Sequence, residues 1–306
     1  MSPRITVIGS INMDLVIRCS TLPGPGETVL ANSAAEVCGG KGANQAVAAA
    51  KAGGRVAMAG RVGDDAFADR LLGNLQREKI DCRHVRRTEH CPSGVAVVAV
   101  EESGQNAILV VSGANGRVGV EDVQAAKEQI ETSDIVLLQL EIPLPSVLAA
   151  IAIARAAGVR VVLDPAPAPS DWPAELLRVD LLCPNESEAA RLTGLPVDSL
   201  EQAQAAASRL HALGAARVAI TLGARGCLLF DGQRHHKIEP FSVRAVDATA
   251  AGDAFAGALA VRWAETQDLR RAVQFANAAG ALAASTHGAQ PGMADREALE
   301  NLANTR

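Results

Sequence analysis

The sequence predicts an α/β fold in which a doubly wound, mostly parallel sheet is flanked by helices. Short apolar runs alternate with alanine-rich segments of helical length along the 306 residues, and this alternation is typical of parallel strands joined by crossover helices. The run DIVLLQL at 134–140 is almost wholly apolar, as expected for a strand that is covered on both faces. A chain with 48% hydrophobic residues has enough apolar surface for one large domain spanning 1–306.

The elements follow one another in a regular order. The predicted strands are 5–10, 56–63, 134–141, 159–165, 179–185 and 216–223, and the predicted helices are 42–53, 65–79, 144–158, 186–194 and 253–265. In such sheets ligands bind beyond the carboxyl ends of the strands. The residues that follow each strand are therefore the first candidates for a functional site.

Two segments, about 15–38 and 93–112, interrupt this alternation. Both have strand-like composition, and both contain turn signals, PGPGE in the first and SGQN in the second, without an intervening helix. We expect two antiparallel excursions that pair into a small β lid over the site or an oligomer contact. The alternative is two unrelated surface hairpins.

Composition excludes several classes of protein. A net charge of −5 and 2% aromatic residues, none of them Tyr, argue against a nucleic-acid partner. The sequence shows no apolar stretch long enough for a signal-peptide core or a membrane span, so we expect no membrane partner and a cytoplasmic location. The six cysteines include no CxxC pair and no zinc-like spacing, so we expect reduced thiols.

Polar residues and glycines follow the predicted strands. Asn12 and Asp14 come after the first strand, where an amide and a carboxylate together suit adjacent hydroxyls, although the pair alone also fits a turn or a helix cap. The stretch GGKGANQ at 39–45 lets backbone approach a ligand closely, and it contains Lys41 and Asn44. Its spacing is not that of a phosphate-binding GxxxxGK[ST] loop.

Further candidates follow the later strands. They are Glu141 after 134–140, Asn185 and Glu188 after 179–184, and Thr221, Gly223 and Gly226 after 216–220. Each of these residues taken alone also has an ordinary structural explanation. Their joint position at successive strand ends favours one ligand site.

The stretch VDATAAGDAF at 246–255 brackets small residues with two aspartates. If 253–265 is a helix, then Ala250, Ala251 and Gly252 form its first turn, whose free N–H groups attract an anion. Asp253 is either a helix cap or a base beside that anion.

Two stretches identify the chain by resemblance as a member of a family. GGKGANQAVAAAKAGGRVAMAGRVGDDAFADRLL at 39–72 and VDATAAGDAFAGAL at 246–259 resemble the two signature regions of the ribokinase family of sugar kinases. SGAN at 112–115, LDPAPA at 163–168, PNESEAARLTG at 184–194 and HGAQPGM at 287–293 are similar to that family in the expected order. The resemblance covers residues 4 to 293.

The resemblance implies ATP-dependent phosphorylation of D-ribose at its 5-hydroxyl, with Asp253 as catalytic base and Ala250, Ala251 and Gly252 as the anion hole. The implied sugar-binding residues are Asn12, Asp14, Gly40, Lys41, Asn44, Glu141 and Asp253. The implied nucleotide-contacting residues are Asn185, Thr221, Gly223, Gly226 and Asn277, with Glu188 associated with Mg²⁺ and phosphate. A homodimer formed through the lid is also implied.

The resemblance further implies a monovalent cation site, which we expect to take K⁺. Its ligands would be the Asp247 carboxylate and main-chain oxygens of Thr249, Ala283, Thr286, Gly288 and, more weakly, Gly292. The chain departs from the family pattern at two positions. Gly292 stands where many relatives have Ser, which removes a hydroxyl ligand, and Ala248 stands where Thr is frequent.

Other functions stay open on the sequence alone. Another acceptor, such as 2-deoxyribose, fructose or a nucleoside, belongs to the same class of reaction, and the adjacent polar pair 12 and 14 favours a pentose. A sugar or nucleotide sensor without catalysis would not need Asp253. An NAD-dependent dehydrogenase would need a GxGxxG stretch after the first strand, which is absent.

Overall fold

The structure, a computed structural model, describes residues 2–101 and 106–305. The strands are β1 Arg4–Ile8, β2 Asn12–Cys19, β3 Ala31–Gly39, β4 Arg55–Val62, β5 Asp81–Arg87, β6 Gly94–Glu101, β7 Asn106–Val111, β8 Ile135–Leu138, β9 Arg160–Leu163, β10 Leu181–Leu182, β11 Val218–Thr221, β12 Cys227–Phe230 and β13 His235–Ile238. The helices are α1 Lys41–Lys51, α2 Ala66–Arg77, α3 Val120–Ala125, α4 Lys127–Glu131, α5 Leu144–Ala156, α6 Glu186–Thr193, α7 Leu200–Ala212, α8 Ala251–Thr266, α9 Leu269–Ala284 and α10 Arg296–Ala303.

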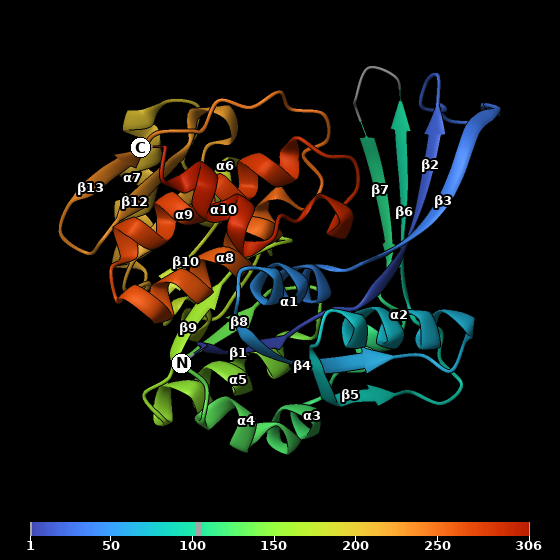
Figure 1. Cartoon of the computed structure of the whole chain (residues 1–306), viewed down its shortest axis with the longest axis horizontal. Coiled ribbons are helices and arrows are strands. Elements are labelled where there is room, and N and C mark those ends of the chain that lie inside the picture. Colours follow the sequence, from blue (N-terminus) through green and yellow to red (C-terminus); the bar gives the residue numbers. More distant parts are fainter. Residues whose placement is uncertain (1, 102–105, 306) are drawn as a thin grey trace.

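A large sheet and a small sheet organise these elements (Figure 1). The large sheet has the strand order β13-β12-β11-β10-β9-β8-β1-β4-β5. Its strands are parallel from β5 to β11, and β12 and β13 are antiparallel to their neighbours. The predicted α/β fold with a mostly parallel, helix-flanked sheet is confirmed.

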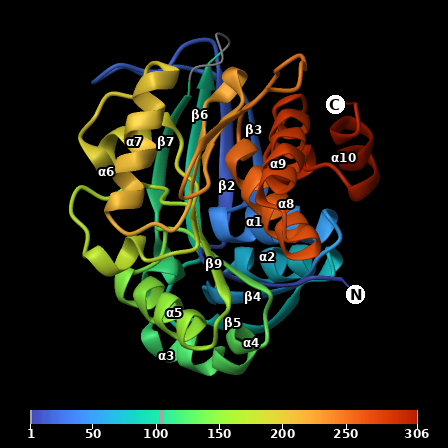
Figure 2. The same cartoon turned by 90° about the vertical axis from the view of Figure 1, so that its left-hand side faces the viewer.

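Helices cover both faces of the large sheet, as the apolar strands require. One buried cluster joins the sheet to α1, α2, α8, α9 and α10, and another joins it to α3 through α7. Figure 2 shows α6 and α7 on the opposite side of the molecule from α8, α9 and α10. No helix in the described part of the chain is long and apolar enough to cross a membrane.

The two sequence excursions form the small sheet, whose order is β3-β2-β6-β7. Each excursion is an antiparallel pair, and the two pairs join through parallel pairing of β2 with β6. The predicted SGQN turn lies largely outside the described residues, which exclude 102–105. In Figure 1 the small sheet rises from the body of the molecule beside α1 and α2.

The exposed apolar surface of the small sheet differs in part from the one expected. Because Val29, Leu30, Val95, Val97 and Val98 lie in the excursions, we expected them to be exposed. Leu30 is 89% exposed as expected. The prediction for Val98 is wrong, because its side chain faces the covered side of β6 and is buried. Apart from Leu30, the large exposed apolar side chains of this sheet come from β7: Ile108, Leu109, Val110 and Val111.

Candidate active site

Gly40, which connects β3 to α1, brings the start of α1 against the segment that follows β1. Gly40 has φ +88°, and a side chain there would lie 2.6 Å from the Asn12 backbone nitrogen, so this close approach requires glycine. The backbone N–H of Lys41 donates to Glu141 at 3.2 Å. The Ser10 hydroxyl donates to the same Glu141 oxygen at 2.5 Å. Three separate segments therefore meet at the carboxyl edge of the sheet.

Helix α8 begins at the turn 250–252. Its N-cap, Ala250, has φ +59°, a left-handed conformation that is uncommon for a residue with a side chain. The N–H of Ala251 donates to the Ala248 carbonyl at 3.2 Å, whereas the N–H groups of Gly252 and Asp253 have no acceptor among the described residues. Two backbone donors at this helix start are therefore available to an anion.

Asp253 lies in the first turn of α8 with 4% of its surface exposed. Its two oxygens accept hydrogen bonds from the Asn44 amide at 3.0 Å and from the Gln45 amide at 3.1 Å. Small residues make this contact between α1 and α8 possible, because a side chain at Gly257 would lie 2.6 Å from the Ala48 β-carbon and from the Gln45 carbonyl oxygen.

The charges around Asp253 are unusually dense. Burial lowers the pKa of the Lys41 ammonium, but four carboxylates outweigh burial and raise that pKa: Asp253, Asp164, Glu141 and Glu188. Burial raises the pKa of Asp253, and Lys41 together with the two amide donors counteracts it. Burial also raises the pKa of Asp164 and of Glu188. One cation thus lies within a cluster of acidic groups that are costly to ionise together.

Asn12 and Asp14 begin strand β2; neither lies in a turn or caps a helix. The Asn12 side-chain oxygen accepts a hydrogen bond from the Asn115 amide at 2.6 Å. One Asp14 oxygen is buried and has no hydrogen-bond partner in the described part of the chain. Burial, then the charges of Glu141 and Asp253, raise the pKa of Asp14 to about 7. A buried acceptor without a donor suits a ligand hydroxyl.

Asn185 and Glu188 cap the start of α6 for each other. The Asn185 N–H donates to the Glu188 carboxylate at 2.8 Å, and the Glu188 N–H donates to the Asn185 side-chain oxygen at 2.9 Å. Thr221, the last residue of β11, pairs with Asn185 in an isolated β-bridge. The structure therefore brings these three sequence candidates together, although two of them also serve as a helix cap.

Gly223 and Gly226 flank the turn between β11 and β12, with φ +54° and +87°. A side chain at Gly226 would lie 2.2 Å from the Ile238 carbonyl oxygen, so this turn packs directly on the end of β13. The Asn277 amide of α9 donates to the Ile238 and Glu239 carbonyls, each at 3.4 Å. The nucleotide candidates of the turn and of α9 thus contact the same segment.

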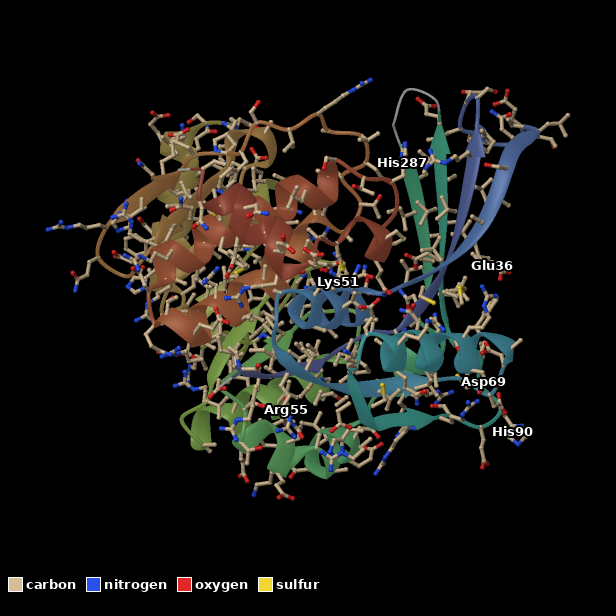
Figure 3. The ribbon with its side chains drawn as sticks, in the orientation of Figure 1. Glu36, Lys51, Arg55, Asp69, His90 and His287 are labelled. Carbon is tan, nitrogen blue, oxygen red and sulfur yellow. The ribbon has the colours of Figure 1, made fainter. Side chains whose placement is uncertain are left out.

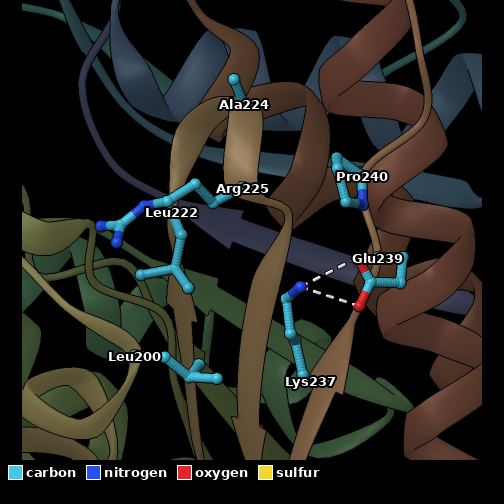
Figure 4. Close-up of a pocket in the computed structure, with 7 residues that line it drawn as sticks. All are labelled: Leu200, Leu222, Ala224, Arg225, Lys237, Glu239 and Pro240. Atoms are coloured by element: carbon cyan, nitrogen blue, oxygen red, sulfur yellow. Dashed lines mark hydrogen bonds and ion pairs between the residues drawn. The ribbon is translucent and has the colours of Figure 1, made fainter.

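Two cavities adjoin these candidates. One of about 310 Å³ lies beside the 223–226 turn, and Figure 4 shows the Lys237 ammonium pointing to the Glu239 carboxylate within it, 2.8 Å away. Its lining comprises Leu200, Leu222, Ala224, Arg225, Lys237, Glu239 and Pro240. The other, of about 390 Å³, reaches from Val110 of the small sheet to Glu141. The second cavity therefore lies between β7 and Glu141, one of the predicted sugar-binding residues.

The candidate cation ligands gather behind the turn at 250–252. The Asp247 carboxylate accepts backbone hydrogen bonds from Thr249 at 3.0 Å and from Gly288 at 2.9 Å. Burial raises the pKa of Asp247, but a hydrogen bond from the Thr249 side chain, together with those from the Gly288 and Thr249 backbone, outweighs burial and lowers it. Asp247 is therefore a stable anion beside the turn.

Gly292 faces two of the predicted carbonyl ligands. A β-carbon at Gly292 would lie 3.1 Å from the Ala283 carbonyl oxygen and 3.5 Å from that of Thr286. Both carbonyls therefore lie next to position 292, where the sequence departs from the expected family pattern. The three groups of predicted residues, for sugar, nucleotide and cation, thus form three neighbouring clusters.

Sequence reasoning did not single out several buried polar residues of the site. They are Ser10, Gln45, Asn115, Gln139, Asp164 and Gln290. Gln45, Asn115, Asp164 and Gln290 lie inside the quoted family stretches, and Gln139 is the last residue but one of the apolar run 134–140. A search for polar residues at strand ends would have found Gln139 and Asp164, but their partners are fixed only by the fold.

The fold and the site together define a phosphotransferase for a small polyhydroxy substrate. A buried carboxylate lies beside two free N–H groups at a helix start, and the unpaired acceptor of Asp14 lies near the charges of Glu141 and Asp253. Residues 2–296 match the model of the pfkB family carbohydrate kinases. The chain belongs to the pfkB family of carbohydrate kinases.

Similar proteins agree over nearly the whole chain. The ribokinase of Haemophilus influenzae is 39% identical over 303 residues, with 99% of each chain covered. The deoxyribokinase of Salmonella typhi is 37% identical over 287 residues, with 94% of each covered. The solved structure of Arabidopsis thaliana ribokinase complexed with ribose and ATP has a TM-score of 0.89 and 35% identity, with 99% of each chain covered.

Proposed function

We propose that the chain catalyses transfer of the γ-phosphate of ATP to the 5-hydroxyl of D-ribose. Full-length similarity to ribokinases supports ATP as the phosphate donor and ribose as the acceptor. The observation that carries this conclusion is the buried Asp253 next to the free N–H groups of Gly252 and Asp253 itself. A base and an anion site are both needed for phosphoryl transfer to a hydroxyl.

In this proposal Asp253 accepts the proton of the sugar hydroxyl as the new phosphate ester forms. The sugar would be held by Asn12, Asp14, Gly40, Lys41, Asn44 and Glu141. The unpaired Asp14 oxygen supports this assignment, because a sugar hydroxyl supplies the donor that it lacks. The Lys41 ammonium has no hydrogen-bond acceptor among the described residues and is therefore free to contact substrate oxygens.

The γ-phosphate would lie on the turn formed by Ala250, Ala251 and Gly252, and Asn185, Thr221, Gly223, Gly226 and Asn277 would contact the rest of the nucleotide. Among the described residues no cluster of three or more His, Cys, Asp or Glu has metal-site geometry. This fits Mg²⁺, which is commonly held by one or two carboxylates and substrate phosphates. Glu188 would face that ion, which supplies positive charge to the phosphates when bound.

A bound K⁺ would lie behind the same turn. Its proposed ligands are the Asp247 carboxylate and the main-chain oxygens of Thr249, Ala283, Thr286, Gly288 and Gly292. The convergence of the Ala283 and Thr286 carbonyls on Gly292 supports an oxygen-lined site. When bound there, the ion adds positive charge next to the phosphate turn.

Release of ADP tests the reaction. We expect ADP to form with D-ribose and not without sugar, whereas a non-catalytic sensor would release none in either case. The control is Asp253→Asn, which should bind both ligands and turn over far more slowly. ADP formation at equal rates with and without ribose would contradict the proposal.

A second acceptor, 2-deoxyribose, is favoured by one observation: deoxyribokinases are as similar to this chain as several ribokinases. Asn12 and Asp14 at the start of β2 favour ribose, because a paired amide and carboxylate match two adjacent hydroxyls. We expect a higher kcat/KM for D-ribose than for 2-deoxyribose or fructose. Asp14→Asn should narrow the difference between the two pentoses.

We propose that the small sheet closes over the sugar as a lid and pairs with a second copy of the chain. Its exposed apolar side chains support this pairing, since Leu109 is 71% and Val111 56% exposed. We expect a dimer by sedimentation and a monomer for Leu109→Asp with Leu30→Lys. A monomeric wild type would contradict the pairing. We also propose a cytoplasmic location, which suits six free cysteines.

A further inference from the structure

Four buried amide side chains form a continuous hydrogen-bonded network around Asp253. We call Asn44, Gln45, Gln139 and Gln290 the amide network; their exposed fractions are 5%, 0%, 0% and 7%. Asn44 and Gln45 contact Asp253 directly, whereas Gln139 and Gln290 contact only these inner amides. The two outer glutamines therefore contact the proposed base only through another residue.

Gln45 has one arrangement that satisfies its neighbours. Its amide nitrogen donates to Asp253 at 3.1 Å and to Asp164 at 2.8 Å, which uses both of its hydrogens. Its oxygen must then point away from the carboxylates, and it accepts a hydrogen bond from the Gln139 amide at 2.6 Å. The Gln139 hydrogen bond disfavours the flipped orientation of the Gln45 amide, in which the Gln45 oxygen would lie against a carboxylate. Without Gln139, that flipped orientation becomes easier to adopt.

Gln139 is itself tightly held at the end of β8. A β-carbon at Gly9 would lie 1.9 Å from the Gln139 side-chain oxygen, so Gly9 leaves the space that Gln139 occupies. That oxygen is buried without a hydrogen-bond partner in the described part of the chain. An apolar side chain would avoid this cost. The presence of an amide at 139 is explained by the hydrogen bond that it gives to Gln45.

Gln290 plays the corresponding part for Asn44. The Asn44 amide nitrogen donates to Asp253, and its oxygen accepts from the Gln290 amide at 3.1 Å. The Gln290 oxygen accepts from Asn74 at 2.6 Å, and the Gln290 backbone carbonyl accepts from the Lys51 ammonium at 3.3 Å. Figure 3 marks Lys51 on α1, which anchors the segment that carries Gln290.

We propose that Gln139 and Gln290 are positioning residues that fix the Gln45 and Asn44 amides with both N–H₂ groups directed at Asp253. The proposal rests on the proposed function, in which Asp253 is the base. The other charged groups that face Asp253 are Lys41 of α1, Asp14 of β2, Glu141, Asp164 and Glu188. Since all but Lys41 are acidic, the two amide donors help to keep Asp253 ionised and aimed at the substrate.

The test replaces each outer glutamine by methionine, which has similar length and no donor. Loss of a hydrogen bond that supports a charged group suggests a fall in kcat of about tenfold for Gln139→Met and for Gln290→Met. KM should stay within about threefold, because neither residue contacts substrate. The acidic limb of the kcat profile should move to higher pH, since a less supported Asp253 needs a higher pH to ionise.

The matched control is Gln129→Met. Gln129 is partly buried on α4, donates to the Thr6 hydroxyl at 3.4 Å and has no contact with Asp253. It should leave kcat and the pH profile unchanged. If Gln139→Met and Gln290→Met match this control while Asp253→Asn abolishes turnover, the positioning role is wrong. If Asp253→Asn keeps its turnover, the proposed function of Asp253 has failed instead.

Gln139→Glu gives a second, independent signature if the methionine variant does not fold. Its protonated carboxyl group still donates to the Gln45 oxygen, but its ionised form repels that oxygen. We expect kcat of this variant to fall as the pH rises, opposite to the acidic limb of the wild type. A profile parallel to that of the wild type would overturn the proposal. In an Asp253→Asn background, Gln139→Met should cause no further loss of kcat.

Discussion

Asp247 and Asp253 lie on either side of the same short turn, yet their surroundings differ. Asp253 is buried among other carboxylates, and burial raises its pKa. Asp247 is partly exposed and accepts two backbone N–H groups, which together with its other neighbours lower its pKa. The first is suited to exchange a proton, and the second is suited to stay charged.

The difference shows that the neighbours of a carboxylate set its role more than its place in a motif. Both aspartates bracket small residues in VDATAAGDAF, and the sequence alone allows Asp253 to be a helix cap, whereas in the structure the N-cap of α8 is Ala250. In the fold, Asp253 faces two side-chain amides among other carboxylates, whereas Asp247 accepts two main-chain N–H groups and a hydrogen bond from the Thr249 side chain.

The largest effect is expected for Asp253→Asn. We expect kcat to fall by at least about two orders of magnitude, the usual contribution of a general base, with ligand binding within a few-fold. An amide cannot accept the hydroxyl proton. Steady-state kinetics and equilibrium sugar binding measure both quantities. A variant with more than about a tenth of wild-type turnover would contradict Asp253 as the base.

The next largest effect is expected in the pH dependence of kcat/KM, and it depends on Asp14. Asp14, which shares the acidic cluster with Asp253, has a pKa raised to about 7. Because its ionised form is the better acceptor for sugar hydroxyls, kcat/KM for D-ribose should rise as the pH passes from below to above that value. A rise of about tenfold per pH unit below the pKa is the expected limit. Asp14→Asn should remove this rise, whereas Asp247→Asn should keep it.

Exchange of monovalent cations tests the role of Asp247. We expect K⁺ to raise kcat several-fold above Na⁺ at matched ionic strength, because a carboxylate and several carbonyls suit a large cation. Asp247→Ala should remove the difference between the two salts. The control is tetramethylammonium, which is too large for the site. Equal rates in all three salts would contradict a cation site at Asp247.

The smallest effect is expected at Gly292. Gly292→Ser returns a hydroxyl next to the Ala283 and Thr286 carbonyls and should lower the half-saturating K⁺ concentration by roughly threefold. Gly292→Ala adds the same β-carbon without the oxygen and is the matched control. If the two variants have the same half-saturating K⁺ concentration, the serine hydroxyl does not contribute to K⁺ binding.

Much of the fold was predictable because its signal is local. The apolar runs 134–141 and 216–223 contain β8 and β11, the run 56–63 overlaps β4, and the helices that follow the runs 56–63 and 134–141 begin close to the expected residues. The antiparallel strands β12 and β13, which end the large sheet on one side, were not predicted. His235–Ile238 is short and largely polar, so its sequence alone does not predict a strand. It forms one by pairing with β12.

The sequence singles out candidates such as Asp253, Lys41 and Asp247, because their residue type and their place in a motif suggest a role by themselves. The site was not predictable where the role depends on a partner far away in the chain. Gln139 lies 94 residues from Gln45, and Gln290 lies 246 residues from Asn44. Only the crossing of α1 with α8 and the return of 290–292 bring these amides together.

The most direct test of the central claim is the product formed from ATP and D-ribose, followed by phosphorus NMR for the wild type and for Asp253→Asn in parallel. We expect a single new phosphate monoester on the 5-hydroxyl with the wild type. We expect no detectable ester on the same timescale with Asp253→Asn, while both proteins bind ribose. An ester on another hydroxyl would contradict the proposed reaction, and equal ester formation by both proteins would contradict Asp253 as its base.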